Sequence, residues 1–308
     1  PPDVEFALTN IMALDARRPR AAATRAFARV APERAAESLL PYLNDKDPGV
    51  ACAVISALWA LPECQARAQA RLEELTREHA TAPAPQRREV ARLLGEIPVV
   101  VGARELRRYV EDPEPSVRLL ALQSAARMFA HAVKEHSPQH VLGLVPVIQA
   151  RLAFRPERPM ARKALMELGD LVVPLLSDNL DDRTLPLAVR LEIPRLLRGI
   201  GTRDAAAALL FSNVQDDPSL RYRIAESLFQ LRRSHPEVEI DRQRTDEACV
   251  RRLRAFEQYR PLCHALASAD ATAPRGGPAR RAWDVLRHAT TDRLMQNLEM
   301  TLHLLGLH

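Results

Sequence analysis

Asp112-Pro113-Glu114-Pro115-Ser116-Val117-Arg118 is the stretch of this sequence that decides the fold, because the chain repeats it. It returns as Asp217-Pro218-Ser219-Leu220-Arg221, and a related form is Asp47-Pro48-Gly49-Val50-Ala51. From the apolar residue of each copy, further apolar or small residues fall at positions i+4, i+7, i+8 and i+11. This spacing predicts that a helix with one buried stripe follows each copy.

Seven copies of this stripe can be aligned along the chain. They begin at residues 23, 50, 86, 117, 161, 189 and 220, with successive gaps of 27, 36, 31, 44, 28 and 31 residues. A second apolar helix fits before each of them, over residues 4–12, 35–43, 68–75, 106–110, 141–148, 172–180 and 206–214. A period of this length, filled by two helices, is typical of an α-solenoid. We therefore predict an all-α fold, an α-α superhelix of about seven helical hairpins.

The turns between the paired helices are rich in Asp, Pro, Gly and Ser. Proline fits the first turn of a helix without losing a hydrogen bond, and aspartate can cap the exposed N–H groups there. The nearest approach to a strand is the short run Val99-Val100-Val101. Both observations favour a purely helical chain.

The hairpins resemble HEAT repeats. The resemblance rests on the Asp-x-x-x-Val-Arg phrasing, on small residues within the second helix, and on the endings Leu94-Gly95, Leu168-Gly169 and Ile200-Gly201. It covers residues 1–235 and implies stacked hairpins with one continuous core. Such repeats most often bind other proteins.

A narrower resemblance covers about residues 170–308. The runs Val173-Pro174-Leu175-Leu176, Leu187-Ala188-Val189-Arg190 and Ile193-Pro194-Arg195-Leu196-Leu197 are similar to the HEAT region fused to bacterial carriers related to the ATP/ADP translocases. Arg221-Tyr222-Arg223 and the ending Leu304-Leu305-Gly306-Leu307 agree with it. This resemblance implies a position on the cytoplasmic side of a transporter.

The last part of the chain, residues 236–308, is predicted to cap the same solenoid. Residues 241–267 and 280–305 each read as one helix, the second with Leu294, Leu298, Thr301, Leu302 and Leu305 on its stripe. Between them, residues 268–279 are rich in Pro, Gly, Ala and Ser and read as a flexible loop. The open end of a solenoid exposes apolar surface, which such a cap would cover.

Composition indicates a soluble helical protein. Of 308 residues, 47% are hydrophobic and 4% aromatic, as expected for cores built from Ala and Leu. No apolar run approaches the roughly 20 residues of a membrane span, and no signal peptide opens the chain. We therefore expect a cytoplasmic segment that does not itself insert into a membrane. Because it opens with Pro1-Pro2, it reads as a piece of a longer protein that could sit on the cytoplasmic side of a membrane.

The four cysteines, Cys52, Cys64, Cys249 and Cys263, show no Cys-x-x-Cys pair. Zinc sites need ligands at closer spacing, so we interpret them as inert thiols in a reducing compartment. We expect neither a metal nor a cofactor.

The cations are almost all arginine. Three of the 44 basic residues are lysines, which leaves 41 arginines against 39 acidic residues and a net charge of +5. Guanidinium groups bind phosphate bidentately, but the arginines are interleaved with Glu and Asp in every repeat. Codon bias is the better explanation for the number of arginines. The positions of the arginines are therefore more informative about function than their number.

Four arginines follow the first buried residue of their helices: Arg118, Arg162, Arg190 and Arg221. In stacked repeats they would form a ladder along one surface. Each could pair with a turn acid such as Asp112, Asp182 or Asp217. Alternatively, the ladder could line a basic concave groove that binds an acidic peptide or a phosphate backbone. The supporting cations would then be Arg195, Arg198 and Arg223.

Three catalysts of similar architecture give specific residues to look for. A di-iron hydroxylase would show adjacent His-Glu dyads, and the sequence has none; His131, His136 and His140 come nearest, with a break expected at Ser137-Pro138. An alkylpurine DNA glycosylase would need aromatic residues and a carboxylate beside a basic groove. Trp59 and Trp283, the two tryptophans of the sequence, fall within or beside apolar stripes, which favours a role in core packing. The repeats also resemble those of bilin lyases, without a chromophore-handling constellation. We expect no catalytic residues.

The sequence thus predicts a noncatalytic scaffolding module that binds another protein, or another domain of its own chain. Nucleic acid, held by the arginine ladder, is the alternative partner.

Overall fold

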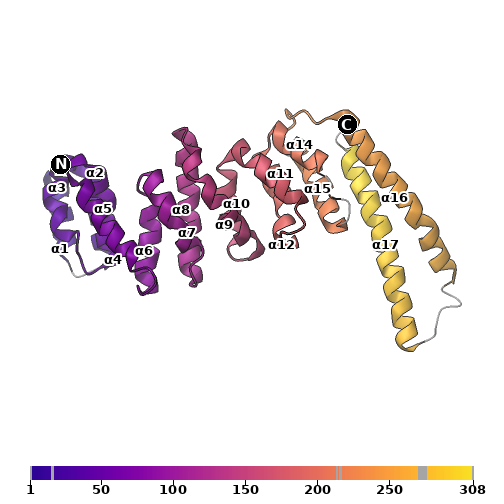
Figure 1. The fold of residues 1–308 in the computed structure, drawn as a ribbon, viewed down its shortest axis with the longest axis horizontal. Coiled ribbons are helices and arrows are strands. Elements are labelled where there is room, and N and C mark those ends of the chain that lie inside the picture. Colours follow the sequence, from indigo (N-terminus) through magenta and orange to yellow (C-terminus); the bar gives the residue numbers. More distant parts are fainter. Residues whose placement is uncertain (1, 15–16, 213, 215–216, 270–275, 307–308) are drawn as a thin grey trace. The chain divides into compact units, whose positions relative to one another are not determined.

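The computed structural model describes residues 2–14, 17–212, 214, 217–269 and 276–306 (Figure 1). Every regular element in these ranges is a helix, so the predicted all-α fold is confirmed. The chain divides into two compact units, Pro1–Leu168 and Gly169–His308. Val99-Val100-Val101, the nearest candidate for a strand, instead begins a helix.

The first unit consists of five helical hairpins. Their first helices are α1 (Pro2–Ala13), α3 (Pro32–Leu39, continued by the 3₁₀ turn η1, Leu40–Tyr42), α5 (Pro62–Arg77), α7 (Val99–Val110) and α9 (Val145–Ala150, after η2 Pro138–His140 and η3 Leu142–Leu144). Their second helices are α2 (Arg17–Val30), α4 (Pro48–Trp59), α6 (Ala84–Leu94), α8 (Pro115–Lys134) and α10 (Arg158–Met166, after η4 Arg151–Ala153). These second helices begin at or a few residues before the five predicted stripes.

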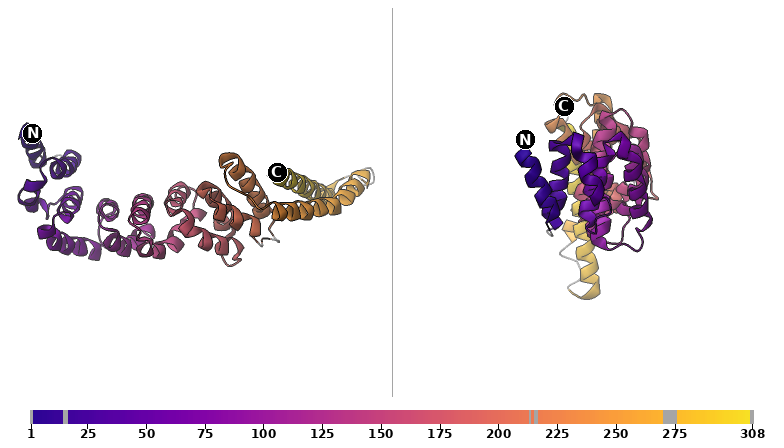
Figure 2. Two further views of the ribbon diagram at one scale, coloured as in Figure 1. Left: turned by 90° about the horizontal axis from the view of Figure 1, so that it is seen from above. Right: turned by 90° about the vertical axis from the view of Figure 1, so that its left-hand side faces the viewer.

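The second helices of this unit stack on one another in chain order. Contacts run from α2 to α4, from α4 to α6, from α6 to α8 and from α8 to α10, while α5 and α7 pack on the preceding or following second helix. In Figure 2 the indigo-to-magenta part of the ribbon accordingly shows two rows of helices. Val117, Ala121, Ala125 and Met128 on the stripe of α8 are buried. One hairpin cannot bury both of its faces, so this stacking makes the core continuous, as in a HEAT-like solenoid.

The second unit continues the pattern with two hairpins and a longer one. Its elements are η5 (Gly169–Val172), α11 (Val173–Asp181), α12 (Leu187–Arg190), α13 (Ile193–Ile200), α14 (Arg203–Phe211), α15 (Pro218–Ser234), α16 (Arg242–Ser268) and α17 (Gly277–Leu305). Pro194 follows the break between α12 and α13, which share one predicted stripe. Proline lacks an N–H and crowds the preceding turn, so it divides this helix in two.

The long hairpin α16–α17 packs on the end of this unit, with α17 against α15 and α16 against α14. The predicted stripe of α17 needs correction. Thr301 is buried, but Leu302 and Leu305 are exposed, while Asn297 and Met300 are buried instead. The predicted loop 268–279 is shorter, since α16 includes Ser268 and α17 begins at Gly277; residues 270–275 lie outside the described residues.

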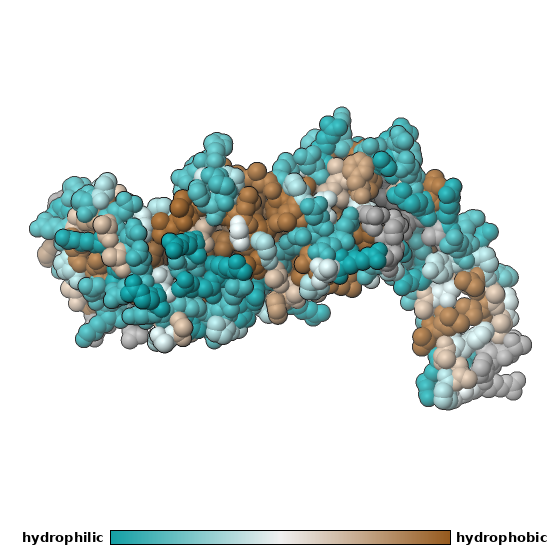
Figure 3. Space-filling view, in the orientation of Figure 1, coloured by the Kyte–Doolittle hydropathy of each residue, from teal (hydrophilic) through white to brown (hydrophobic). Residues whose placement is uncertain are grey.

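Two helices alone leave part of the long hairpin's apolar surface uncovered. Val285 is 68% exposed and Leu286 is 52% exposed. Figure 3 shows brown apolar surface on this hairpin. The hairpin therefore covers α15 while exposing apolar side chains of its own.

Aspartate caps three helices as the turn chemistry predicts. The side chain of Asp47 accepts a hydrogen bond from the Gly49 N–H at 2.8 Å, Asp217 from Leu220 at 3.0 Å, and Asp241 from Arg244 at 3.0 Å. Asp112 differs, because Glu114 holds the N-cap position of α8. The carboxylate of Asp112 serves another purpose, described below.

Candidate functional site: a groove along the second helices of residues 1–168

Arg118, the first arginine of the predicted ladder, is bound to protein acceptors. Its Nε lies 2.7 Å from Oε1 of Glu157, the residue before α10. Its Nη1 donates to the backbone carbonyls of Asp112 and Pro113, at 2.7 and 2.8 Å. The side chain is 17% exposed. Arg118 therefore joins one hairpin to the next, and pairs with Glu157 in place of the Asp112 carboxylate.

Arg190, the second member, is buried. Its Nε and Nη2 both donate to the carbonyl oxygen of Leu180, at 3.0 and 2.8 Å. Because Leu180 lies on α11, the arginine joins the two helices of its own hairpin. Asp182, one of the turn acids offered as a partner, accepts instead from the Thr184 N–H.

The other predicted cations lie in varied surroundings. Arg162 is half-buried on α10, and Arg221 is half-buried near the start of α15. Arg195 forms an ion pair with Glu192 at 3.9 Å, and Arg223 with Glu226 at 3.1 Å, each one turn away on its own helix. Arg198 donates to the side chain of Gln230.

A second arginine, Arg87, acts as Arg118 does, although the sequence analysis did not single it out. Arg87 on α6 binds Asp112 with Nε to Oδ2 at 2.8 Å and Nη2 to Oδ1 at 3.0 Å. Nε2 of His79 lies 3.0 Å from the same Oδ2. Burial lowers the pKa of His79, although the Asp112 carboxylate opposes this effect. Arg87 directly follows Gln86, the first position of its stripe, which is the signal that it shares with Arg118.

A groove follows the second helices of the first unit. One cavity of about 500 Å³ is lined by α2, α3, α4 and α8 together with Glu96, and a second of about 480 Å³ extends it along α8. The two share Ser56, Ala60, Glu96 and Arg127, so they form one continuous depression. Small residues of α4 line its floor: Ala53, Ser56, Ala57 and Ala60.

The groove lies on the opposite side of the second helices from the predicted ladder. Counted from the first residue of each stripe, four groove residues on the second helices fall at positions +3, +6 or +10, whereas the ladder falls at +1. At about 100° per residue, the nine residues from +1 to +10 amount to two and a half turns. The ladder position therefore faces away from the groove. The groove residues at these positions are Arg29, Ala53, Ser56 and Arg127.

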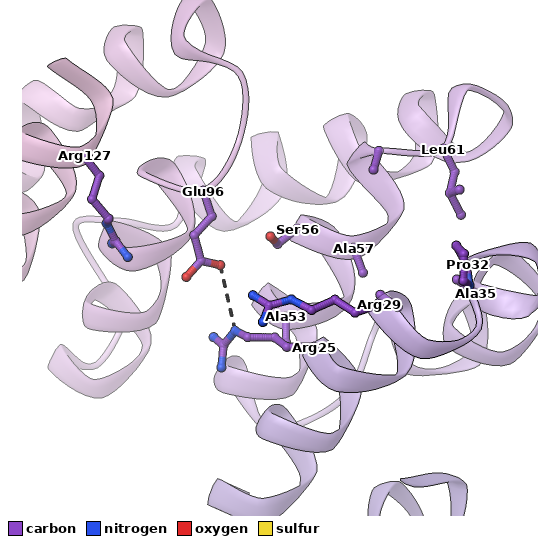
Figure 4. Close-up of a pocket in the computed structure, with 12 residues that line it drawn as sticks. Arg25, Arg29, Pro32, Ala35, Ala53, Ser56, Ala57, Leu61, Glu96 and Arg127 are labelled. Atoms are coloured by element: carbon purple, nitrogen blue, oxygen red, sulfur yellow. Dashed lines mark ion pairs between the residues drawn. The ribbon is translucent and has the colours of Figure 1, made fainter. Parts of the chain in front are cut away.

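The first cavity is lined by three arginines and one glutamate, which give it a net charge of +2. Figure 4 shows four charged side chains around Ser56 and Ala57: Arg25 and Arg29 of α2, Arg127 of α8, and Glu96, which follows α6. Nε of Arg25 lies 3.9 Å from Oε2 of Glu96. Arg127 donates to the hydroxyl of Ser124 at 3.0 Å. Arg29 is exposed and makes no ion pair with any other residue that the structure describes.

The far end of the groove is less basic. There His131 lies with its Nε2 3.0 Å from Oε1 of Glu135, on the last turns of α8. Helix α8 ends at Lys134, before the Ser137-Pro138 break that the sequence predicted. His136 and His140 follow it and are exposed. Within the described ranges, no group of three or more His, Cys, Asp or Glu side chains is placed to hold a metal ion.

Such a groove is suited to binding. Small side chains let a ligand approach the helix backbones closely, and arginines at the rim attract negative charge.

No described helix is long and apolar enough to span a bilayer. Trp59 is buried in α4 and borders the second cavity, while Trp283 on α17 is half-buried.

Comparison with known proteins assigns the chain to no family. No protein-family model matches the chain, and no curated protein does. Among solved structures, an engineered protein covers 75% of this chain and 97% of its own at 17% identity, with a TM-score of 0.36. A second engineered protein covers 99% and 98% at 14% identity, with a TM-score of 0.31. Human deoxyhypusine hydroxylase in complex with glycerol covers 95% and 96% at 17% identity, also with a TM-score of 0.31.

Proposed function

We propose that this chain is a noncatalytic helical-repeat module whose groove binds an acidic segment of a partner protein. The observation that carries this proposal is the continuity of the groove. Two cavities on adjoining second helices share four residues, among them Ser56 and Ala60. A single small ligand occupies a pocket of about 300–1,000 Å³. Two such volumes in line suit a longer ligand, such as a helix or an extended peptide.

The alanine floor supports a peptide as the ligand. Ala53 and Ala57 on α4 and Ala60 directly after it lie about one turn apart, so no bulky side chain blocks the depression there. Apolar side chains of a peptide can enter between the neighbouring helices at such a place. Arg25, Arg29 and Arg127 stand around that floor and outnumber Glu96. Opposite charges across an interface speed association and select the partner, which favours an acidic segment.

Peptide selection tests this proposal. A phage-displayed library of acidic peptides of about 15 residues would be selected against the whole chain, and the recovered peptides measured by fluorescence polarisation. Ala57→Trp should fill the groove and weaken their binding at least about tenfold, which corresponds to about 1.4 kcal/mol. The matched control is Ala70→Trp, an exposed position on α5 outside the groove. Peptides that bind both variants equally, or a failure to recover acidic peptides, would refute the proposal.

Nucleic acid is the alternative ligand for the exposed cations. Arg118 and Arg190, which the ladder needs, donate to protein acceptors instead. Binding to a phosphate backbone weakens steeply with ionic strength, because counterions are released. Oligonucleotide binding that survives Ala57→Trp and falls steeply with salt would favour this alternative over the groove.

We also propose a setting for the module, supported by the sequence resemblance of residues 170–308 alone. In that setting the partner is a bacterial carrier and the module lies on the cytoplasmic side of the membrane. Co-purification of this chain, in detergent, with a bacterial carrier related to the ATP/ADP translocases would test the setting. Loss of the complex in Ala57→Trp, but not in Ala70→Trp, would tie the setting to the groove.

A further inference from the structure

A separate cavity of about 360 Å³ lies within residues 169–308, between the start of α15 and the long hairpin α16–α17. Four arginines from three helices line it: Arg221, Arg251, Arg254 and Arg293. No carboxylate lines it in the described part of the chain. We propose that this cavity binds a small phosphate ester that carries hydroxyl groups, such as a sugar phosphate.

The charges of the cavity favour an anion as its ligand. Guanidinium groups stay protonated at any ordinary pH, and their like charges repel one another. Arg251, Arg254 and Arg293 form no ion pair with any residue whose position is described. A phosphate dianion would relieve this repulsion and accept paired hydrogen bonds from the planar guanidinium groups.

The start of α15 adds to the attraction for an anion. Pro218, in the first turn of this 17-residue helix, lines the cavity. The positive end of the helix dipole therefore faces the same space as the arginines. Asp217 caps the helix, with its side chain accepting from the Leu220 N–H at 3.0 Å, and is not among the lining residues.

Two buried acceptors explain why the ligand should carry hydroxyl groups. Asn297, which is 3% exposed, donates through Nδ2 to the Arg293 carbonyl at 2.8 Å, while its Oδ1 is buried without a hydrogen-bond partner. Reversing this amide would set oxygen against oxygen, so its orientation is fixed. Oε1 of Gln296 is buried without a partner as well. Buried acceptors need a donor, which a bare phosphate dianion lacks and a sugar hydroxyl supplies.

The size of the cavity agrees with a small ester. About 360 Å³ is near the lower end of the range for small-molecule sites. Gln258 and the half-buried Tyr259 complete the lining with polar atoms. The cavity thus combines cations and uncharged hydrogen-bonding groups in its wall.

Calorimetric titration of the whole chain at low salt tests the proposal with three probes: ribose 5-phosphate, inorganic phosphate and ribose. We expect ribose 5-phosphate to bind most tightly, phosphate more weakly, and ribose without measurable heat. Replacing both exposed arginines, Arg251→Gln with Arg254→Gln, should weaken ribose 5-phosphate by about tenfold or more, as loss of charged hydrogen bonds predicts. The matched control is Arg242→Gln with Arg260→Gln, two exposed arginines of the same helix outside the cavity.

The acceptors are tested by Gln296→Met and Asn297→Leu, each checked for its unfolding temperature. Either variant should remove the advantage of ribose 5-phosphate over phosphate and leave phosphate binding as it was. Three results would overturn the proposal: no binding of ribose 5-phosphate to the unaltered chain, equal losses in the control pair, or affinity for a single-stranded oligonucleotide that grows with its length. The last would show a phosphate backbone as the ligand.

Discussion

Arg87 binds the buried carboxylate of Asp112 through two hydrogen bonds, of 2.8 and 3.0 Å, and so joins α6 to the turn that precedes α8. Arg118 and Glu157 repeat this relationship between α8 and the start of α10. In both cases the arginine stands one residue after the first position of its stripe. Arg87 and Arg118 thus hold neighbouring hairpins of the first unit together.

Removing the charge of Asp112 should destabilise the first unit. Asp112→Asn leaves Arg87, whose side chain is 14% exposed, without its carboxylate. Breaking a buried ion pair costs about 3 kcal/mol or more, and we expect a loss of that order in the free energy of unfolding measured with denaturant. Glu111→Gln breaks an exposed pair with Arg107 and should cost at most about 1 kcal/mol. Equal losses in the two variants would contradict a structural role for the Arg87 pair.

The same carboxylate should make stability depend on pH in the acid range. Burial raises the pKa of Asp112, but hydrogen bonds from Arg87 and from the Glu114 N–H outweigh burial and lower the pKa below its ordinary 3.8. Because the pKa of Asp112 is lower in the folded state, its carboxylate contributes fully to the stability of the fold at pH values above its pKa in the unfolded chain. This contribution is lost as the pH falls through its pKa in the folded state.

The difference in unfolding free energy between the native chain and Asp112→Asn should therefore stay constant above about pH 5 and shrink below the unfolded pKa. Denaturant titrations across the range from neutral to acid pH measure it. If the difference in unfolding free energy instead shrinks as the pH rises above neutrality, a group other than the Asp112 carboxylate is responsible for the pH dependence.

Gly102→Ala should destabilise the packing of α7 against α6 and α8. A Cβ at this position would meet the carbonyl oxygen of Leu94 and would lie 2.8 Å from Cε of Met128. Overpacking of this kind costs about 1–3 kcal/mol, which exceeds the roughly 1 kcal/mol that alanine gains in helix propensity. Gly143 has no atom within 4 Å of its Cβ position. Gly143→Ala should change the unfolding temperature little, and a similar drop in both variants would refute the packing argument.

Arg190→Met should cost more than Arg195→Met. The first leaves the buried carbonyl of Leu180 without its two donors, and an unsatisfied buried acceptor costs about 1–3 kcal/mol. The second removes an ion pair of 3.9 Å from a side chain that is 36% exposed, and such pairs contribute about 0–1 kcal/mol. Equilibrium unfolding of both variants gives the comparison. The reverse order would mean that Arg190 is free to serve a ligand.

The cysteines should differ in their reactivity toward iodoacetamide. Burial raises the pKa of Cys52 well above its ordinary 9.0, and burial also raises the pKa of Cys249. Thiolate is the reactive form, so neither should be alkylated in the folded protein at neutral pH. Cys263 is half-buried and should react first. Mass spectrometry of the labelled peptides measures the order, and early labelling of Cys52 would show that α4 opens readily.

The sequence predicts the helices and their buried stripes well because both depend on spacing along a single helix. Phe27, Val90 and Leu228 lie on predicted stripes and are buried. The stripe of α17 is predicted less well, because the polar Asn297 enters the core that α17 shares with α15 and α16. Hydrophobicity does not identify such polar members.

The site could not be predicted in the same way. Periodicity places Arg118 and Arg127 at known angles on α8, but it does not say which angle faces the neighbouring hairpins and which faces solvent. That depends on how successive hairpins stack. The groove also rests on Ala53, Ala57 and Ala60, and in a chain so rich in alanine, small residues give no distinct signal. Ala57, at +7, also lies on the predicted buried stripe, so the spacing does not separate it from the core.

Site-specific photocrosslinking tests the central claim most directly. A benzoylphenylalanine in place of Ala57 would lie in the groove, and one in place of Ala70 would lie outside it on α5. With an acidic peptide recovered by selection, we predict a crosslinked product from position 57 and none from position 70. Crosslinking from position 70 alone, or equally from both, would contradict binding in the groove.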